Sequence, residues 1–492
     1  MIGKKIYLLV FICLFGHLCI SQPVKERLII LADMGHDPDE EQQIIHMLTR
    51  SNHFDLEGLI AVTGRFFRPN PTDTVKDLRP YLFHDIINSY AEVYPNLLLH
   101  AEGWPSPEHL HSIVANGQIG NGMKDVWPGN ASLGSQMIFE SVIKKDPRPI
   151  NIVINAGANT LAQALIDYKF QHTKEELQAF VAKLRVYDNS GQDDAGAWIC
   201  SEFPEIFWIR SIAQNRCFGG PSNTNLEPHC WKPFAYSPEG QHAWVNEHVQ
   251  MGHGALGAAY PDRTVGTTTH YLEGGGTIPL LAFGLSGLNN ISEPSWGGWG
   301  GRFSSEKLPN VSSAFSIIHS DEQLFEPYKM YSENLETLDR WIDPSDSTVY
   351  HNVYTSSWRW RQAMWNDFRA RMDWCIASFE KANHHPIAVV NGDHSGQILR
   401  MNSKPGQLLE FDASDSKDPD GDLLTFSWWF YLEAGINPYP RQIQLKLISP
   451  FKIQFEVPED ASGKELHLIL EVTDDHPEVS LVDYRRIVVT VE

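Results

Sequence analysis

The feature that most constrains this chain is an acidic stretch, residues 33–41, that directly follows the apolar run of residues 28–32. A short apolar run bounded by charged residues is typical of a strand buried on both faces of a parallel sheet. Gly35 and Pro38 then turn the chain, and the apolar spacing after Gln42 predicts a helix. The acidic stretch is therefore predicted to lie at a strand-to-helix corner, where open α/β sheets bind ligands.

Five carboxylates within nine residues also predict a cation at this corner. Like charges so close together raise one another's pKa unless they are neutralised, and hard oxygen ligands suit Ca²⁺ or Mg²⁺. A second interpretation needs no metal, because an acidic first turn complements the dipole of the helix that follows it.

The first residues of the chain predict export. Lys4 and Lys5 precede an apolar stretch that ends before Ser21, which is the pattern of a cleaved signal peptide over residues 1–21. No later segment reaches the roughly 18 apolar residues of a membrane span, so no integral membrane association is expected. A secreted or periplasmic protein is predicted.

The net charge and the cysteines of the chain limit its binding partners and its cross-links. The net charge of −22 argues against a nucleic-acid partner, because phosphate groups need positive partners. Cys217 and Cys230 enclose a loop rich in glycine and proline and are candidates for a disulfide in an oxidising compartment. Zinc is less favoured, because no two pairs of ligands have the spacing of a zinc site.

A change of pattern near residue 384 predicts two domains, over residues 22–383 and 384–492. The second part contains seven strand-like runs, which favours a β-sandwich. These runs are residues 387–390, 408–411, 424–431, 443–447, 452–455, 466–472 and 486–491. Its Asp418, Asp420 and Asp422 alternate as in a calcium loop, but Gly421 and Trp429 do not fit the EF-hand pattern, so a plain acidic turn is the better interpretation.

Two further strand-to-helix corners in the first domain offer polar side chains. Asn159 and Thr160 follow the apolar residues 150–154, where an ordinary helix N-cap is the alternative interpretation. Asp193 and Asp194 end a polar loop after another strand and are suited to binding sugar hydroxyls, although a solvated loop has a similar composition.

Histidines and tryptophans supply the remaining candidates. His253, and His270 with Glu273, lie near flexible glycine-rich backbone, and a charged histidine can protonate a leaving group. Residues 296–302 place two tryptophans and an arginine on a glycine frame. Exposed rings in such a frame would stack against the face of a sugar or a base, whereas core packing is the alternative.

Taken together, four motifs resemble the secreted nucleoside-hydrolase-like proteins often labelled cellulose-binding, which carry an immunoglobulin-like C-terminal domain. The motifs are residues 31–41, 157–165, 192–198 and 296–302. The resemblance covers nearly all of the chain after the leader. It implies a doubly wound, mostly parallel α/β domain followed by a smaller all-β sandwich.

The resemblance also implies a calcium site, because nucleoside hydrolases hold Ca²⁺ with an acidic cluster after the first strand. Asp33 matches the aspartate that also activates water, Asp39 and Glu40 match the adjacent acidic pair, and the loop at Asn159 and Thr160 matches the source of a backbone carbonyl ligand. This chain departs from the pattern by extra residues between Asp33 and Asp39. It also has Glu273, followed by three glycines, where the family places a late aspartate.

These observations predict a secreted, metal-dependent hydrolase of a glycosidic bond that acts on oligosaccharides or glycosides from polysaccharide degradation. The expected metal ligands of a Ca²⁺ ion are Asp33, Asp37, Asp39, Glu40 and Thr160. Asp33 would activate water and His253 or His270 would protonate the leaving group. The expected substrate-binding residues are Asn159, Asp193, Asp194, Glu273, Trp296, Trp299 and Arg302. A non-catalytic carbohydrate-binding protein and a nucleoside N-ribohydrolase are the alternatives.

Overall fold

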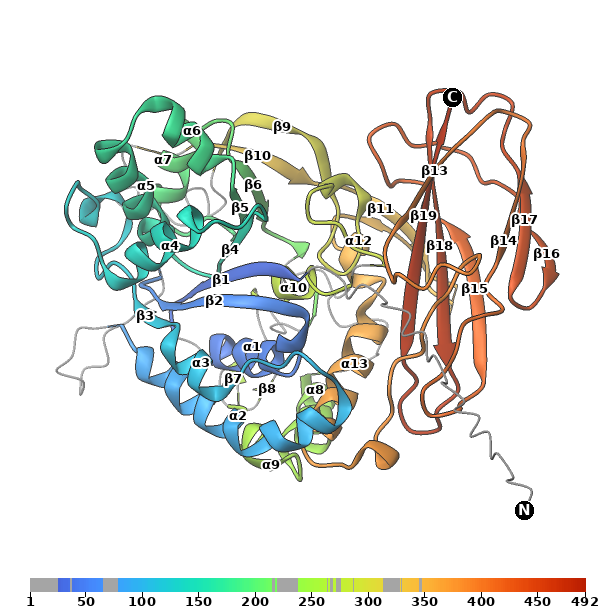
Figure 1. Cartoon of the computed structure of the whole chain (residues 1–492), viewed down its shortest axis with the longest axis horizontal. Coiled ribbons are helices and arrows are strands. Elements are labelled where there is room, and N and C mark those ends of the chain that lie inside the picture. Colours follow the sequence, from blue (N-terminus) through green and yellow to red (C-terminus); the bar gives the residue numbers. More distant parts are fainter. Residues whose placement is uncertain are drawn as a thin grey trace, which may run out of the picture.

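The computed structural model describes residues 25–35, 38–64, 78–214, 217–218, 238–262, 264–265, 269–270, 276–285, 287–312, 328, 330–344 and 347–492. It places an α/β domain beside a smaller domain built only of strands (Figure 1). The expected signal peptide, Asp37, Cys230 and Glu273 lie outside the described residues, as does the side chain of His270. No helix in the described part of the chain is long and apolar enough to cross a bilayer.

An eight-stranded, mostly parallel sheet forms the centre of the α/β domain, with the order β3-β2-β1-β4-β5-β6-β10-β9. Only β9 and β10 pair in antiparallel fashion within it. The strands are β1 (Glu26–Ala32), β2 (Phe54–Ala61), β3 (Val114–Asn116), β4 (Ile150–Ile154), β5 (Leu184–Asn189), β6 (Phe207–Ser211), β9 (Phe303–Ser312) and β10 (Met330–Glu336). The predicted doubly wound, mostly parallel architecture is confirmed.

The side chains of β1 show why this strand is central. Leu28 and Ile30 pack into the core on one face of the sheet, and Ile29 and Leu31 pack into the core on the other face. Successive side chains of a strand point to opposite faces, so a strand covered on both sides must be apolar at every position. The continuous apolar run in the sequence follows directly from this burial.

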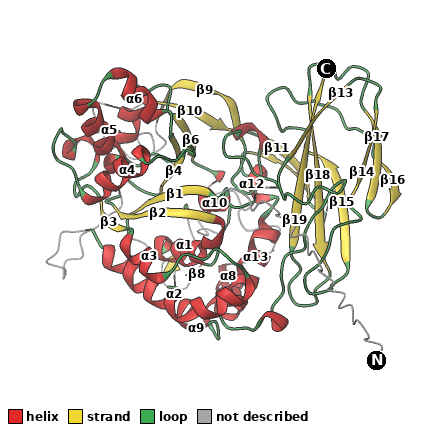
Figure 2. Cartoon of the chain, in the orientation of Figure 1, coloured by secondary structure: helices red, strands yellow, loops and turns green. Residues whose placement is uncertain are grey.

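Helices cover both faces of the sheet (Figure 2). One face carries α1 (Asp39–Leu48), α2 (Pro80–His100), α3 (Pro107–Ser112), α8 (Pro238–Val245), α9 (Gly254–Ala258), α10 (Thr277–Leu281) and α13 (Arg361–Trp374). The other carries α4 (Leu133–Ile143), α5 (Asn159–Gln171), α6 (Lys174–Val181) and α7 (Asp194–Glu202). Two short hairpins, β7 (Thr264–Val265) with β8 (Thr269–His270) and β11 (Asp339–Ile342) with β12 (Val349–Asn352), and α12 (Thr355–Trp358) complete this domain.

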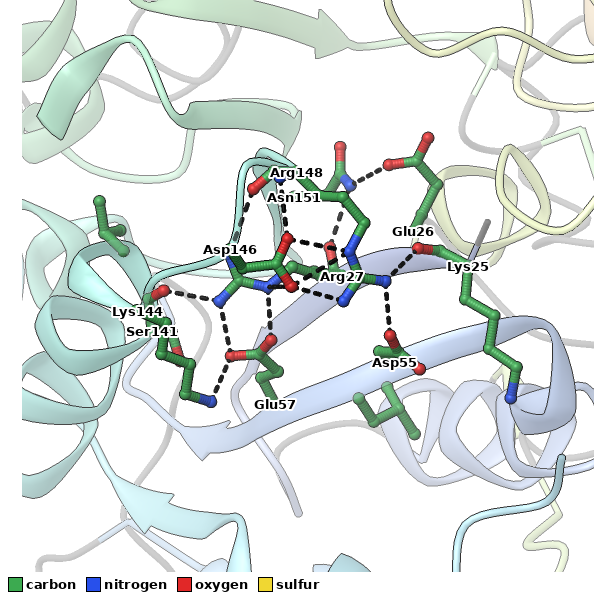
Figure 3. Close-up of polar contacts among 12 residues, drawn as sticks. Lys25, Glu26, Arg27, Asp55, Glu57, Ser141, Lys144, Asp146, Arg148 and Asn151 are labelled. Carbon is green, nitrogen blue, oxygen red and sulfur yellow. Dashed lines mark hydrogen bonds and ion pairs between the residues drawn. The ribbon is translucent and has the colours of Figure 1, made fainter. Parts of the chain in front are cut away.

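The amino ends of β1, β2 and β4 are joined by a partly buried ionic network (Figure 3). The fully buried guanidinium of Arg27 donates to both oxygens of Glu57, at 2.5 and 3.0 Å, and to the carbonyl of Ser141 at 2.6 Å. Arg148 binds Asp55 at 2.6 Å and the carbonyl of Lys25 at 2.7 Å. This network fixes the amino edge of the sheet, opposite the edge where the acidic stretch lies.

The C-terminal domain consists of two packed sheets, one of four strands in the order β13-β19-β18-β15 and one of three in the order β14-β17-β16. Its strands are β13 (Leu399–Ser403), β14 (Leu408–Asp412), β15 (Leu424–Phe430), β16 (Lys446–Ser449), β17 (Lys452–Glu456), β18 (Glu465–Asp474) and β19 (Val482–Val491). The predicted sandwich is confirmed, with two differences. Residues 387–390, expected to be a strand, make only two isolated bridges, and β13 was missed.

Residues 296–302 form the junction between the two domains. Arg486 of β19 donates to the carbonyl of Trp296 at 2.7 Å, and the ring of Trp299 meets the ring of Tyr484 edge-on at 6.2 Å. Gly297 has a φ of +72°, and a Cβ there would collide with the ring of Tyr431. The glycines of this segment therefore allow a close approach of the sandwich to the α/β domain.

Candidate active site

The candidate site lies where the direction of strand order reverses, between β1 and β4. Helix α1 follows β1 on one face of the sheet, whereas α5 follows β4 on the other. In open α/β sheets such a reversal leaves a ligand-binding crevice at the carboxyl ends of the two strands. The amino ends of β1 and β2 face the sandwich, because Glu26 and His53 line a cavity together with Arg400. The crevice therefore opens away from the C-terminal domain.

Asp33 is the first residue after β1 and is buried in this crevice. Leu31 pairs with Ile154 of β4, which brings Asp33 level with Ala156. A Cβ at Gly64, beyond the end of β2, would collide with the carboxylate of Asp33 and lie 3.1 Å from the Cβ of Ala156. The chain at Gly64 and at Ala156 thus packs against the Asp33 carboxylate, and residue 64 must be glycine because a side chain there would collide with it.

Two amide side chains follow β4 at the same edge of the sheet. The Nδ2 of Asn155 donates to Gln43 of α1 at 2.8 Å, and the Nδ2 of Asn159 donates to the carbonyl of Gly120. The Oδ1 atoms of both asparagines are buried and have no hydrogen-bond partner among the described residues. Because an unpaired buried acceptor is costly, these two oxygens are suited to receive a hydroxyl group or a cation.

Asp193 and Asp194 hold loops of the protein itself. Asp193 is the N-cap of α7, accepting from the N–H of Ala195 at 3.0 Å, and it also accepts from the N–H groups of Ala158 and Gly122. Asp194 accepts from the N–H of Met123 at 2.8 Å. Burial raises the pKa of both carboxyls, that of Asp194 to about 6, while the backbone donors oppose the rise. Asp193 therefore positions the loop after β4, the start of α7 and the segment at Gly122.

Glu41 is a carboxyl group of this region that the sequence did not single out as a site residue. It lies in the first turn of α1 and hydrogen-bonds to the backbone of Gly35, two residues after Asp33. Burial, with the nearby charge of Asp39, raises its pKa to about 7 against the opposing hydrogen bonds and Arg79. A carboxyl group with this pKa keeps a proton near neutral pH and can donate it. Its place in the acidic stretch was visible in the sequence, but its burial was not.

The described residues do not by themselves form the expected calcium site. Asp39 and Glu40 lie buried in the first turn of α1, yet no group of three or more His, Cys, Asp or Glu side chains within the described ranges is arranged to hold a metal ion. Thr160 lies inside α5, whose carbonyls point along the helix toward its C-terminus, so the loop carbonyl expected there is directed elsewhere. The Oγ1 of Thr160 instead accepts from the N–H of Gln118 at 2.9 Å.

The assignment of His253 as proton donor is wrong. His253 precedes α9 and its Nε2 lies 3.1 Å from Asp373 of α13. The neighbouring Gly254 approaches Val93 of α2, whereas Gly35 approaches Leu82 of the same helix. Eleven residues separate these two positions along α2, about 16 Å of helix rise. His253 therefore lies far from Asp33.

The expectation of an exposed aromatic surface is also wrong. Trp296 and Trp299 are 2% and 0% exposed, because the sandwich covers them. Arg302 is buried as well and donates to Asp339 at 2.7 Å and to the carbonyl of Leu338 at 2.7 Å. Trp296 and Trp299 contact the sandwich, Arg302 is bound within the α/β domain, and none of the three offers a surface to a sugar.

The fold and the crevice at the β1–β4 switch point define a nucleoside-hydrolase-like α/β protein with an appended β-sandwich. Residues 27–303 match the model of the family described as cellulose-binding Sde182, nucleoside hydrolase-like domain, and residues 408–491 match the C-terminal domain of cellulose-binding protein Sde0182. The chain belongs to this family.

A solved structure supports this assignment over nearly the whole chain. It is a nucleoside hydrolase-related hypothetical protein from Saccharophagus degradans that is associated with carbohydrate metabolism. Its sequence is 35% identical, the match covers 95% of this chain and 100% of that one, and the TM-score is 0.77. No curated protein matches significantly.

Proposed function

We propose that this protein hydrolyses a glycosidic bond of a saccharide bound at the carboxyl ends of β1 and β4. The observation that carries the proposal is the buried carboxylate of Asp33 at the topological switch point, together with the unpaired amide oxygens of Asn155 and Asn159 after the neighbouring strand β4. Sites of this kind combine an enclosed reactive group with a few polar groups that orient the ligand.

In the proposed reaction, Asp33 takes a proton from a water molecule whose oxygen attacks the anomeric carbon. The bond from that carbon to the leaving oxygen breaks, and the leaving oxygen receives the proton of Glu41. Asn155 and Asn159 accept hydrogen bonds from sugar hydroxyls and fix the ring. Glu41 takes the role first expected of His253, while the side chain of His270 lies outside the described residues.

A calcium ion remains a proposal that depends on Asp37 and Glu273, which lie outside the described residues. The buried oxygens of Asp33 and the two asparagines are hard ligands of the type that Ca²⁺ prefers, but they do not complete a site. The proposed reaction assigns no step to an ion. Calorimetric titration of the chelator-treated protein with Ca²⁺ tests this part separately, and binding that is lost in Asp33→Asn is the expected result.

Membership of a family described as cellulose-binding, and the association of the Saccharophagus protein with carbohydrate metabolism, support a saccharide over a nucleoside. Export through residues 1–21 is part of the same proposal, since such saccharides arise outside the cell. N-terminal sequencing of the mature protein tests it.

The test is product release from soluble cello-oligosaccharides, 4-nitrophenyl glycosides and nucleosides, with calcium and with a chelator. We expect turnover of a glycoside that falls at least about 100-fold in Asp33→Asn, the scale of losing a general base. Asp415→Asn, an exposed aspartate of the sandwich, is the matched control and should keep full activity. Turnover of nucleosides alone would assign the nucleosidase function instead.

Non-catalytic carbohydrate binding is the second candidate, favoured by the incomplete set of metal ligands among the described residues. Under this alternative no glycoside is turned over, and the protein still binds oligosaccharides in a calorimetric titration. Fold alone does not decide between the two functions.

A further inference from the structure

Two buried histidines meet at the junction of the domains, far from the proposed active site. His100 is the last residue of α2, and His384 lies in the segment that leads from α13 into the sandwich. Their rings face each other through a hydrogen bond of 2.9 Å between Nδ1 of His100 and Nε2 of His384. Both residues line a cavity of about 470 Å³ between the two domains.

Each ring makes a second hydrogen bond to an acceptor. The Nδ1 of His384 lies 3.0 Å from the carboxylate of Asp420, and the backbone N–H of His384 donates to the same carboxylate at 2.7 Å. The Nε2 of His100 lies 3.1 Å from the carbonyl oxygen of Ala377. An ionised carboxylate and a carbonyl only accept, so the outer nitrogen of each ring must carry a proton.

Counting protons then fixes the charge of the pair. The outer nitrogens need two protons, and the hydrogen bond between the rings needs a third. Two neutral imidazoles carry only two protons in total. The pair therefore holds one more proton than two neutral rings, and its positive charge is balanced by Asp420.

The positive charge of the pair is assigned to His384. This ring contacts Asp420 directly and stacks on the face of Phe379 with 3.9 Å between ring centroids, an arrangement that favours a cation. Burial, with the neighbouring His384, lowers the pKa of His100 against the opposing hydrogen bond of Ala377 and the charge of Asp420, so His100 is the neutral partner. Trp374 stacks parallel to His100 with 5.2 Å between centroids and closes the other side.

The other charged groups around this cavity bind one another or the backbone rather than the histidine pair. Asp367 binds Arg50, accepts from Arg371 at 2.7 Å and pairs with His385 at 2.8 Å. His53 accepts from Arg371 at 2.8 Å, and burial, with the charges of Arg371 and Arg50, holds the pKa of His53 well below its usual value. Asp483 accepts from the N–H of Ala388 at 2.8 Å, and burial raises its pKa. None of these groups offers the histidine pair a second counter-charge.

We infer that His100, His384 and Asp420 form a binding site for one shared proton that latches the α/β domain to the sandwich. The site joins the end of α2, the connecting segment and the loop between β14 and β15. This gives Asp420 a structural role, while Asp418, whose Oδ1 accepts from the N–H groups of Asp420, Gly421 and Asp422, shapes the turn that presents it.

The latch has a defined response to pH. When His100 also binds a proton, two N–H groups face each other across the ring-to-ring hydrogen bond and the contact is lost. Because the pKa of His100 is lowered in the folded state, the unfolded chain binds this proton more readily. The stability that the latch contributes is therefore greatest near a pH of about 6.5, the usual value for histidine. It declines as the pH falls below this value, because the unfolded chain then binds the second proton more readily, and as the pH rises above it, because the folded pair keeps a proton that the unfolded chain releases.

The experiment is an NMR measurement on the full mature chain with ¹⁵N-labelled histidine at pH 7.5, where an unperturbed imidazole is about 90% neutral. We expect a doubly protonated ring for His384 that disappears in Asp420→Asn and persists in the control Asp415→Asn. The ring of His385, which also lies between a carbonyl and a carboxylate, should give a second such signal that Asp420→Asn leaves in place. Loss of the same resonances in His384→Gln assigns them.

The absence of a second doubly protonated ring beside that of His385 in the wild-type spectrum at pH 7.5 would overturn the inference, whether or not any variant folds. A doubly protonated His384 ring that is indifferent to Asp420→Asn would overturn it as well. Hydrogen exchange supplies a second readout. Once corrected for the intrinsic effect of pH, protection of residues 96–101 and 416–422 should fall between pH 6.5 and pH 5, and unchanged protection would contradict the latch.

Discussion

Replacing Trp299 by alanine separates the two roles that this residue could have. If its ring were exposed for sugar stacking, the substitution would abolish binding and leave stability nearly unchanged. In the structure the ring is fully buried, contacts Tyr484 edge-on, and lies 5.3 Å from the guanidinium carbon of Arg50. The structure therefore predicts a loss of stability.

The magnitude follows from the buried area. A buried tryptophan removes about 150–250 Å² from water, which at about 25 cal/mol per Å² gives about 4–6 kcal/mol. Large-to-alanine substitutions of aromatic core residues cost about 3–5 kcal/mol in practice, so we expect a loss of about 4 kcal/mol in the free energy of unfolding.

Urea unfolding followed by circular dichroism measures this loss. The control is Phe170→Ala, because that ring is 76% exposed on α5 and its removal should change the free energy of unfolding by at most about 0.5 kcal/mol. A loss below about 1 kcal/mol in Trp299→Ala, together with weakened oligosaccharide binding, would refute the assignment of Trp299 to the domain junction.

Three further predictions concern the sheet and the site. Arg27→Met removes the buried partner of Glu57, which keeps only the exposed Lys144, and should cost about 1–3 kcal/mol in urea unfolding. Arg27→Met combined with Glu57→Leu should recover much of this loss, and equal losses in both would contradict the ionic role. Asp193→Ala removes an N-cap and two loop contacts and should lower the free energy of unfolding by about 1–3 kcal/mol, and an unchanged stability with lost sugar binding would restore Asp193 to the substrate site. Glu41 donates only while protonated, so activity should fall as the pH rises through about 7. Glu41→Gln should lose this pH dependence and be least impaired on 4-nitrophenyl glycosides, whose leaving group needs little protonation. A fall in the activity of Glu41→Gln over the same pH range would exclude Glu41 as the donor.

Much of the fold was predictable, because it follows from local pattern. The apolar run before Asp33 and the turn at Gly35 belong to one continuous piece of chain, and the same is true of β4 with Asn159. Burial on both faces requires apolar residues at every position of such strands. The place of Asp33 at a strand-to-helix corner could therefore be predicted from the sequence.

The errors arose where distant segments decide the outcome. Trp296 and Trp299 are covered by Arg486 and Tyr484, which lie nearly 190 residues further along the chain. His253 is drawn to Asp373 of another helix, and no local pattern reports that partner. Strand β13 was missed because its residues alternate between exposed and partly buried, with no apolar run to mark it. Contacts between domains leave no periodic signal in the sequence.

The most direct test of the central proposal is turnover in water enriched in ¹⁸O, using the glycoside that the wild-type protein processes best. If water activated by Asp33 attacks the anomeric carbon, the heavy isotope appears in the sugar product, and product formation falls at least about 100-fold in Asp33→Asn. A sugar product without the isotope, or one formed equally well by the variant, would contradict the proposed site and its chemistry.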